Sequence, residues 1–395
     1  MNILRSKGEI YTELYRLGGL RDFFYGCLVP STGYLDKFCL TPYHGSVLLS
    51  MPSINDTSKV IVGDDQPKLF NAFKEHTEFN ALLGVKNVGD LNLSILENKN
   101  SASNLIKIAE ALQEKKIAKI ADEIAKREKA RIVLLAGPSS SGKTTSSKRL
   151  SVQLAVCGLK PIAVSLDDYF VPRSETPRDE KGNYDFESLY ALDLELFNND
   201  LNKLLAGEEV ELPRYNFETG LREYNGNKVK LTEGCVLIFE GIHALNPLLT
   251  AKIPAENKFK IFVSALTSIS LDDHNCIPTT DNRLIRRIVR DYKYRGYSAE
   301  DTIMRWPDVM RGEEKWIVPF QEEADAMFNS AMIFELGVLK QHALAPLNLV
   351  PQSSPAYMEA VRLLKFLGYF ASIPESEIPQ TSLLREFVGG SSFKY

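Results

Sequence analysis

One run of eight residues combines the types and spacing that bind phosphate. Gly137-Pro138-Ser139-Ser140-Ser141-Gly142-Lys143-Thr144 matches the pattern GxxxxGK[ST]. Glycines let the backbone turn its N–H groups toward phosphate oxygens, and a following helix adds the positive end of its dipole. The lysine would reach the β- and γ-phosphates and the threonine would hold Mg²⁺. We predict that ATP and Mg²⁺ bind at this loop, through Gly137, Ser139, Ser140, Ser141, Gly142, Lys143, Thr144 and Thr145.

Acidic residues follow two apolar stretches further along the chain. Asp167 and Asp168 end one stretch, and Glu240 ends another. In open parallel sheets the carboxyl ends of the strands face the ligand crevice. A hydroxyl acceptor needs a carboxylate that takes its proton, and either aspartate could do this, although both could be ordinary turn residues. Glu240 stands where a second ligand for Mg²⁺ is expected beside Thr144.

Arginines are concentrated in one short segment, where helical spacing places them on one face: Arg283, Arg286, Arg287 and Arg290, followed by Arg295. We interpret the segment as a lid that closes over the nucleotide and neutralises charge on the transferred phosphoryl group. The alternative is a solvated helix face paired with Asp281 and Asp291. A GTP-specific site would need an NKxD motif, which the sequence lacks.

Apolar strands that alternate with helices must position these groups. We predict strands at 132–136, 161–166, 235–239, 260–263 and 331–334, and helices at 143–157 and 192–205. This order is typical of a doubly wound parallel sheet of the P-loop NTPase type, an α/β fold with helices on both faces.

Three further regions surround this predicted domain, which spans 131–345. Residues 1–95 are rich in aromatic and turn residues, with a strand expected near 46–49, and predict a small α+β domain. Residues 96–130 show helical periodicity and predict a connecting helix. Residues 346–395 predict a helical C-terminal extension with a helix at 357–369.

Composition favours a cytoplasmic protein. Five cysteines lack CxxC spacing, which argues against a disulfide framework and a zinc site: Cys27, Cys39, Cys157, Cys235 and Cys276. No apolar run approaches the roughly 18 residues of a membrane span, and the start lacks the apolar core of a secretory signal. A formal net charge of −4 does not favour binding to nucleic acid.

Several segments, in order, resemble the uridine kinase/phosphoribulokinase family. They cover roughly 132–334, and they are the GxxxxGK[ST] loop, Asp167-Asp168-Tyr169-Phe170, Asn183-Tyr184-Asp185, Pro213-Arg214-Tyr215-Asn216-Phe217, Phe239-Glu240-Gly241-Ile242 and the run from Arg283 to Asp291. The resemblance implies that Asp167, rather than Asp168, is the catalytic base, acting with Lys143, Arg287 and Arg290. It also implies substrate contacts from Asp185 to ribose and Tyr215 to the base, with further contacts from Tyr169, Arg222, Arg283 and Arg286.

Two positions depart from the uridine-cytidine kinase pattern. Asn216 stands where aspartate is usual, and Gly220 stands where a histidine follows the pocket tyrosine, which leaves base identity open. Segments at 272–281 and 319–330 resemble a uridine kinase-like branch whose N-terminal region is related to threonyl-tRNA synthetase accessory domains. His44 and His76 form no HxxxH pair, so we expect no editing or metal chemistry there.

The expected function is ATP-dependent phosphorylation of a small-molecule hydroxyl, in the first place the 5′-hydroxyl of uridine or cytidine. Other acceptors stay open: a purine nucleoside, ribulose 5-phosphate or pantothenate. A second class of function is a nucleotide-gated, RNA-associated binding module. We expect no membrane or nucleic-acid partner from the sequence, and homo-oligomerisation is compatible with it.

Overall fold

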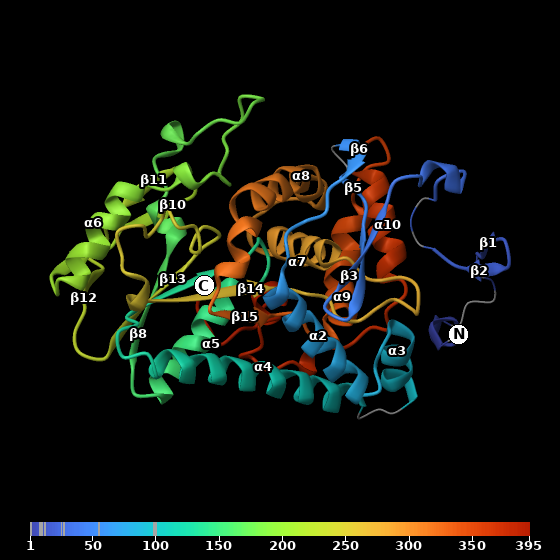
Figure 1. Ribbon diagram of the computed structural model, residues 1–395, viewed down its shortest axis with the longest axis horizontal. Coiled ribbons are helices and arrows are strands. Elements are labelled where there is room, and N and C mark those ends of the chain that lie inside the picture. Colours follow the sequence, from blue (N-terminus) through green and yellow to red (C-terminus); the bar gives the residue numbers. More distant parts are fainter. Residues whose placement is uncertain are drawn as a thin grey trace.

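A five-stranded parallel sheet forms the centre of the protein in a computed structural model that describes residues 2–7, 11, 13–24, 26, 28–53, 56–97 and 101–395 (Figure 1). Its order is β15-β14-β7-β13-β8. The strands are Ala326–Asn329 (β15), Lys258–Ser264 (β14), Ile132–Ala136 (β7), Cys235–Glu240 (β13) and Lys160–Ser165 (β8). Because β13 lies between β7 and β8, the carboxyl ends of these three strands are neighbours. The prediction of a parallel α/β sheet is confirmed.

The sheet has a hydrophobic core on each face, which explains why its strands are apolar at nearly every position. Along β7, Val133 and Leu135 belong to one core cluster. Ile132 and Leu134 belong to the other, because successive side chains of a strand point to opposite faces. The helices over the first face include α4 (Ser101–Ala125), α5 (Lys143–Val156) and α7 (Thr279–Tyr294), and α6 (Leu194–Leu205) covers the second.

The fifth predicted strand is wrong. The run 331–334 is a turn that leads into α9 (Glu335–Asn348), and the edge strand is β15, a few residues earlier. Phe334 is fully buried, so the apolar run does reach the core, but from a turn and not from a strand. A short apolar run alone does not distinguish these two conformations. The other predicted strands overlap β7, β8, β13 and β14.

The remaining helices pack mainly around α7 and α9. They are α8 (Ala299–Trp316), α10 (Tyr357–Leu367) and α11 (Arg385–Val388). Leu284, Ile285, Ile288 and Val289 of α7 are all buried. The arginine-rich segment is therefore part of a helix packed into the core, and its closure over a nucleotide stays a prediction.

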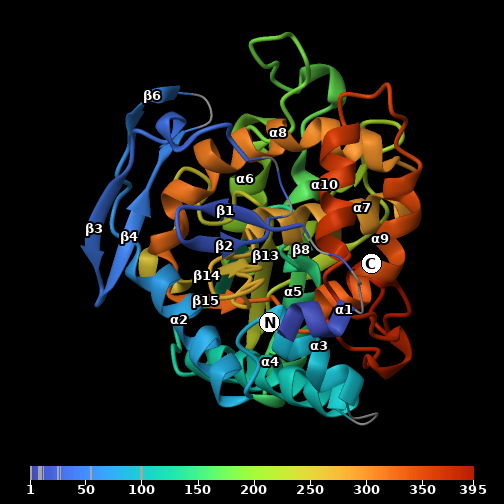
Figure 2. The ribbon, with the colours of Figure 1, turned by 90° about the vertical axis from the view of Figure 1, so that its right-hand side faces the viewer.

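The described part of the N-terminal region adds the helices α1 (Asn2–Lys7), α2 (Pro67–Leu82) and α3 (Val88–Glu97). Its described strands pair as β1–β2 (Tyr15–Leu17, Leu20–Asp22), β3–β4 (Cys39–Tyr43, Ser46–Ser50) and β5–β6 (Pro52–Ser53, Asp56–Val60). Figure 2 shows β3–β4 standing at the outer edge, away from the central sheet. Helix α2 is tied to the central domain because Asn80 donates to Ser268 (2.9 Å) and Lys68 donates to the Glu322 carbonyl (2.8 Å).

Two small antiparallel sheets follow α6 in the chain. Strands β10 (Arg214–Asn216) and β11 (Leu221–Glu223) form a hairpin, and β9 (Glu209–Glu211) pairs with β12 (Lys228–Lys230) on either side of it in the sequence. None of the helices in the described ranges has the length and apolarity that a membrane span requires. Cys27 lies outside the described residues, and the other cysteines are free thiols.

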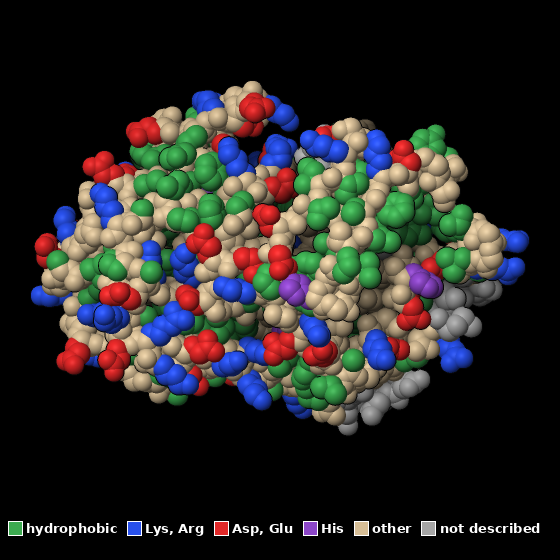
Figure 3. Space-filling view, viewed as in Figure 1, with side chains coloured by type: hydrophobic (Ala, Val, Ile, Leu, Met, Phe, Trp, Pro, Cys, Tyr) green, Lys and Arg blue, Asp and Glu red, His purple; other side chains and the backbone are tan. Residues whose placement is uncertain are grey.

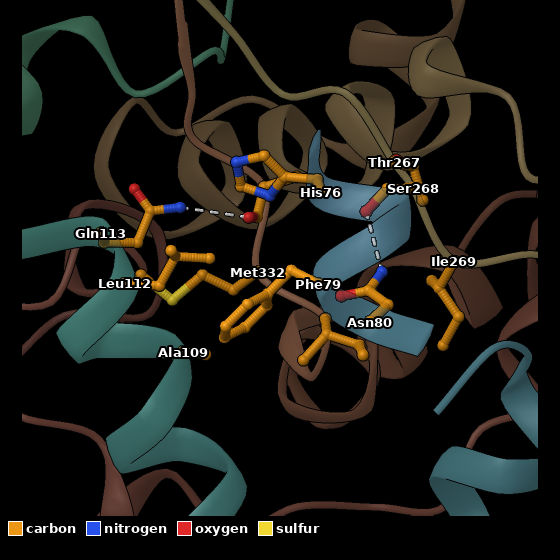
Figure 4. Close-up of a pocket in the computed structure, with 12 residues that line it drawn as sticks. His76, Phe79, Asn80, Ala109, Leu112, Gln113, Thr267, Ser268, Ile269 and Met332 are labelled. Carbon is orange, nitrogen blue, oxygen red and sulfur yellow. Dashed lines mark hydrogen bonds between the residues drawn. The ribbon is translucent and has the colours of Figure 1, made fainter. Parts of the chain in front are cut away.

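A cavity of about 20 Å³ lies between α2, α4 and the segment after β14 (Figure 4). Its lining includes His76, Phe79 and Asn80 from α2, Gln113 from α4, and Met332. Gln113 donates to the Ala331 carbonyl at 3.2 Å. No residue of the phosphate loop lines this cavity, so it belongs to the junction between the N-terminal region and the sheet.

Candidate active site

The phosphate loop connects β7 to α5, and two of its glycines occupy positions that a side chain would disturb. A Cβ atom on Gly137 would lie 2.0 Å from the Val263 carbonyl oxygen, so the loop crosses β14 at backbone contact. Gly142 has a φ of +82° and Ser140 a φ of +60°, both in the left-handed region. Helix α5 begins at Lys143, so the N–H groups of the first turn point back toward the loop. This is the geometry of an anion site.

Lys143 lies among carboxylates at the centre of the site. Its Nζ donates to the Pro138 carbonyl at 3.1 Å. Burial lowers the pKa of Lys143, while Glu240, Asp167 and Glu386 oppose that effect. The ammonium group is thus the common neighbour of both predicted acids.

Thr144 and Glu240 are in direct contact. The threonine hydroxyl lies 2.9 Å from Oε1 and 3.1 Å from Oε2 of the glutamate. Burial raises the pKa of Glu240 to about 7, and Lys143 is the main opposing influence. A partly buried carboxylate beside a hydroxyl offers hard oxygen ligands, which fit Mg²⁺. Across the described residues no group of three His, Cys, Asp or Glu could hold a metal ion, and Mg²⁺ at this position would take its other ligands from water and nucleotide phosphates.

The adjacent aspartates have separate environments. Asp168 accepts a hydrogen bond from the Tyr215 N–H at 3.2 Å, which fixes hairpin β10–β11 to the end of β8. Asp167 presents much of its surface to solvent, yet the surrounding protein raises its pKa by desolvation. Lys143, Arg295 and Arg290 oppose this rise. The charge of Asp167 therefore acts on Lys143 of the phosphate loop, whereas Asp168 is engaged by the hairpin.

Arg283 and Arg286 hold the loop itself. Arg283 donates to the Ser139 carbonyl at 2.9 Å and pairs with Glu313. Arg286 is fully buried, pairs with Glu335, and donates to the Ser140 carbonyl at 3.3 Å. The predicted substrate contacts of these two arginines are corrected, because their guanidinium groups are enclosed by the protein.

The other arginines of this segment share one buried carboxylate. Asp291 lies 3.2 Å from Arg287 Nε, 2.8 Å from Arg290 Nη2 and 3.7 Å from Arg295 Nε. Arg287 also donates to the Ser139 hydroxyl at 2.8 Å. All three arginines thus pair with Asp291, as one alternative drawn from the sequence expected, and Arg287 also reaches the phosphate loop.

Aromatic side chains gather beside Asp168. The Tyr215 ring centroid lies 5.5 Å from that of Phe170 and 5.0 Å from that of Phe217, and Phe186 lies 6.4 Å from Phe170. Tyr215 is buried, and its hydroxyl has no partner in the described part of the chain. Figure 3 shows hydrophobic side chains gathered over the region of β10, β11 and α6.

The remaining predicted substrate residues are dispersed. Tyr169 is corrected: its side chain is 1% exposed and its hydroxyl donates to Asp200 at 3.3 Å, so it belongs to the core over α6. Arg222 pairs with Asp193 at 2.7 Å. Asp185 accepts from the Glu187 N–H at 3.2 Å, within its own loop.

Gly220 is required by the turn that contains it. Its φ is +73°, and a Cβ atom there would lie 2.8 Å from Cβ of Arg173. Arg173 donates through its backbone N–H to the Gly220 carbonyl (2.9 Å) and through its guanidinium to the Phe217 carbonyl. The backbone of a histidine at position 220 would therefore be strained. The guanidinium group of Arg173 lies beside the aromatic cluster instead.

Sequence reasoning missed three glutamates. Glu313 accepts from the Ser139 N–H at 3.3 Å. Burial raises the pKa of Glu187 to about 7, with Arg287 as the main opposing charge. Glu386 accepts from both the N–H and the hydroxyl of Thr145, at 3.1 and 2.7 Å. Glu313 and Glu386 lie far along the chain from the loop, so no local spacing could have revealed them.

The sequence of this chain matches the model of a known protein family. The model of the "Phosphoribulokinase / Uridine kinase family" matches residues 132–334. The uridine kinase of Ligilactobacillus salivarius (strain UCC118) is 31% identical over 205 residues, which are 51% of this chain and 86% of that protein. The uridine kinase of Halobacterium salinarum is 28% identical over 193 residues, 48% of this chain and 76% of that protein. Among solved structures, D-glycerate 3-kinase from Cryptococcus neoformans superposes with a TM-score of 0.37 at 14% identity, over 53% of this chain and 89% of that one.

Proposed function

The chain belongs to the phosphoribulokinase/uridine kinase family, and we propose that it transfers the γ-phosphate of ATP to the 5′-hydroxyl of a pyrimidine nucleoside. The observation that carries the proposal is the convergence on Lys143 of two acids, Glu240 and Asp167. One of these acids touches Thr144 and suits a metal ion, and the other is available for proton transfer. The resemblance of residues 1–95 to synthetase accessory regions lies outside the matched range and stays a prediction.

The donor side consists of the loop, Lys143, Thr144 and Glu240. The N–H groups of the first turn of α5, which have no acceptor within the helix, and the lysine would bind the phosphates. Thr144 and Glu240 would hold Mg²⁺, which would draw charge from the phosphate oxygens. Arg283, Arg286 and Glu313 are positioning residues in this proposal, since they fix the carbonyl and N–H groups of Ser139 and Ser140.

The acceptor side supplies the base and the binding surface. As the acceptor oxygen bonds to the γ-phosphorus, its proton passes to Asp167 and the bond from the γ-phosphorus to the bridging oxygen of ADP breaks. Arg287 and Arg290 lie near this region and would offset negative charge as it spreads over the transferred group. Desolvation by the surrounding protein would strengthen each of these interactions.

The preference for a pyrimidine nucleoside rests on the aromatic cluster. Phe170, Tyr215 and Phe217 form a wall suited to a flat base. The Tyr215 hydroxyl has no acceptor among the described residues, and a base carbonyl would satisfy it. Asp185 would bind the ribose hydroxyls, as the family resemblance implies.

The test is consumption of Mg-ATP in the presence of uridine, cytidine, adenosine, ribulose 5-phosphate or pantothenate. We expect at least a tenfold stimulation by uridine or cytidine, and product phosphorylated at the 5′ position. Lys143→Ala serves as the inactive reference, and Lys252→Ala, which changes an exposed lysine, as the matched control. Stimulation by another acceptor would keep the chemistry and refute the pyrimidine assignment, and no stimulation by any would refute the proposal.

A further inference from the structure

The C-terminal segment reaches the phosphate loop from outside the family-matched range. Helix α11 places the Glu386 carboxylate on Thr145, 3.1 Å from its N–H and 2.7 Å from its hydroxyl. The Tyr395 hydroxyl lies 2.9 Å from the same threonine oxygen. Leu383 closes on the loop so tightly that a Cβ atom on Gly142 would lie 2.6 Å from its Cδ2.

The Thr145 N–H is a donor that a nucleotide would use. The first intrahelical bond of α5 is donated by Ser146 to Gly142, so the N–H groups of Lys143, Thr144 and Thr145 have no helical acceptor. Loops of this type bind the α- and β-phosphates through such donors. Since Lys143 and Thr144 would serve the β- and γ-phosphates in such a loop, we assign the Thr145 N–H to the α-phosphate.

Glu386 occupies that position with a negative charge of its own. An anion at a helix N-terminus is stabilised there, so the contact is favourable while no nucleotide is bound. A phosphate oxygen on the same N–H would lie within a few ångströms of the carboxylate, and the two anions would repel each other. The negative charge of Glu386 also raises the pKa values of Lys143 and Glu240, so it acts on other groups of the nucleotide site as well.

The helix that carries Glu386 is firmly anchored. Leu384 and Phe387 are fully buried, and Lys293 donates to the Val388 carbonyl. Glu386 itself is only half-buried, and Tyr395 is 61% exposed. Removal of the carboxylate from Thr145 therefore requires a side-chain rotation and movement of the last residues, while α11 stays in place.

We propose that Glu386 lowers the affinity of the nucleotide site, because its carboxylate competes with the α-phosphate for Thr145. The inference rests on the proposed function for the assignment of the loop to ATP. It predicts that the wild-type protein binds nucleotide more weakly than the same site would bind it without the charge of Glu386.

The experiment measures the dissociation constant of Mg-ATP by calorimetry on the full chain. Glu386→Gln keeps an acceptor for Thr145 and removes the charge, and Glu386→Ala removes both. We expect both variants to bind Mg-ATP about tenfold more tightly than wild type. Glu377→Gln, an exposed glutamate of the same C-terminal region, is the matched control and should leave the affinity unchanged.

A merely structural role would give a different pattern. If Glu386 only stabilises the fold, Glu386→Gln would lower the melting temperature without tightening nucleotide binding, and that result would overturn the inference. Binding is read independently of turnover, so the two proposals fail separately. Unchanged affinity in an active kinase removes this inference alone, whereas tighter binding without transfer to any acceptor removes only the acceptor chemistry.

Discussion

The hydroxyl of Thr144 lies 2.9 Å from the carboxylate of Glu240, although 96 residues separate them in the chain. The contact joins the start of α5 to the end of β13, and it exists because β7 and β13 are parallel neighbours that end at the same edge of the sheet. Lys143 and Asp167 lie at this edge as well, so the donor and acceptor sides of the proposed reaction meet there.

Replacement of Asp167 by Asn should abolish most turnover and spare ATP binding. The amide cannot take the acceptor's proton, and loss of a general base costs about 10²–10⁴-fold in rate. Steady-state kinetics and a nucleotide titration check this prediction. Asp168→Asn is the comparison, since Asp168 is engaged by the Tyr215 N–H and should affect the hairpin more than the proton transfer. Near-normal activity of the Asp167 variant would refute its role as the base.

Replacement of Arg286 by Met should destabilise the protein. Arg286 and Glu335 form a fully buried pair, and removal of one partner from such a pair costs about 3–5 kcal/mol. Denaturant unfolding measures the loss. Arg311→Met, which breaks an exposed pair with Asp308, should cost at most about 1 kcal/mol. A variant of Arg286 that is as stable as wild type but binds acceptor poorly would restore the substrate role that we have corrected.

Replacement of Tyr215 by Phe should weaken acceptor binding and leave stability nearly unchanged. The Tyr215 hydroxyl is buried without a partner among the described residues, so the apo protein loses no hydrogen bond when it is removed. The KM for uridine or cytidine should rise about tenfold, the effect of one hydrogen bond to a bound ligand. Tyr224→Phe, at an exposed position, is the control. An unchanged KM would exclude the hydroxyl from the base pocket.

His76 should make the fold sensitive to acid. Burial lowers its pKa from 6.5 to about 4; the nearby Glu75 opposes this effect, and Lys116 adds to it. The folded state thus favours the neutral His76 ring. The contribution of that ring to the free energy of unfolding is fully present above pH 6.5 and is lost as the pH falls toward 4. The loss approaches about 3 kcal/mol for a shift of this size.

Unfolding curves of wild type and His76→Gln between pH 4 and 8 test this sensitivity. The variant should lose less stability on acidification, because it has no ring to protonate. His274→Gln, whose ring is 61% exposed, should behave like wild type. Parallel pH profiles for wild type and His76→Gln would contradict the prediction.

Contiguous patterns determined the central features of the molecule. The conformation of the eight-residue loop could be predicted because its glycines, the strand before it and the helix after it are all local in the sequence. The apolar strands that alternate with helices predicted the parallel sheet. The contact between Thr144 and Glu240 could be anticipated for the same reason, since parallel strands bring their carboxyl ends together. The run 331–334 shows the limit, because burial alone does not say whether an apolar run is a strand or a turn.

Tertiary structure decided the partner of each charged group. Helical spacing placed four arginines on one face of α7, but only packing determined that Arg286 is enclosed with Glu335 and that Arg287 reaches the Ser139 hydroxyl. Glu386 lies 241 residues from the threonine that it contacts, and no motif connects the two. Hydrogen bonds and ion pairs act over a few ångströms, so long-range partners are settled only when the chain has folded.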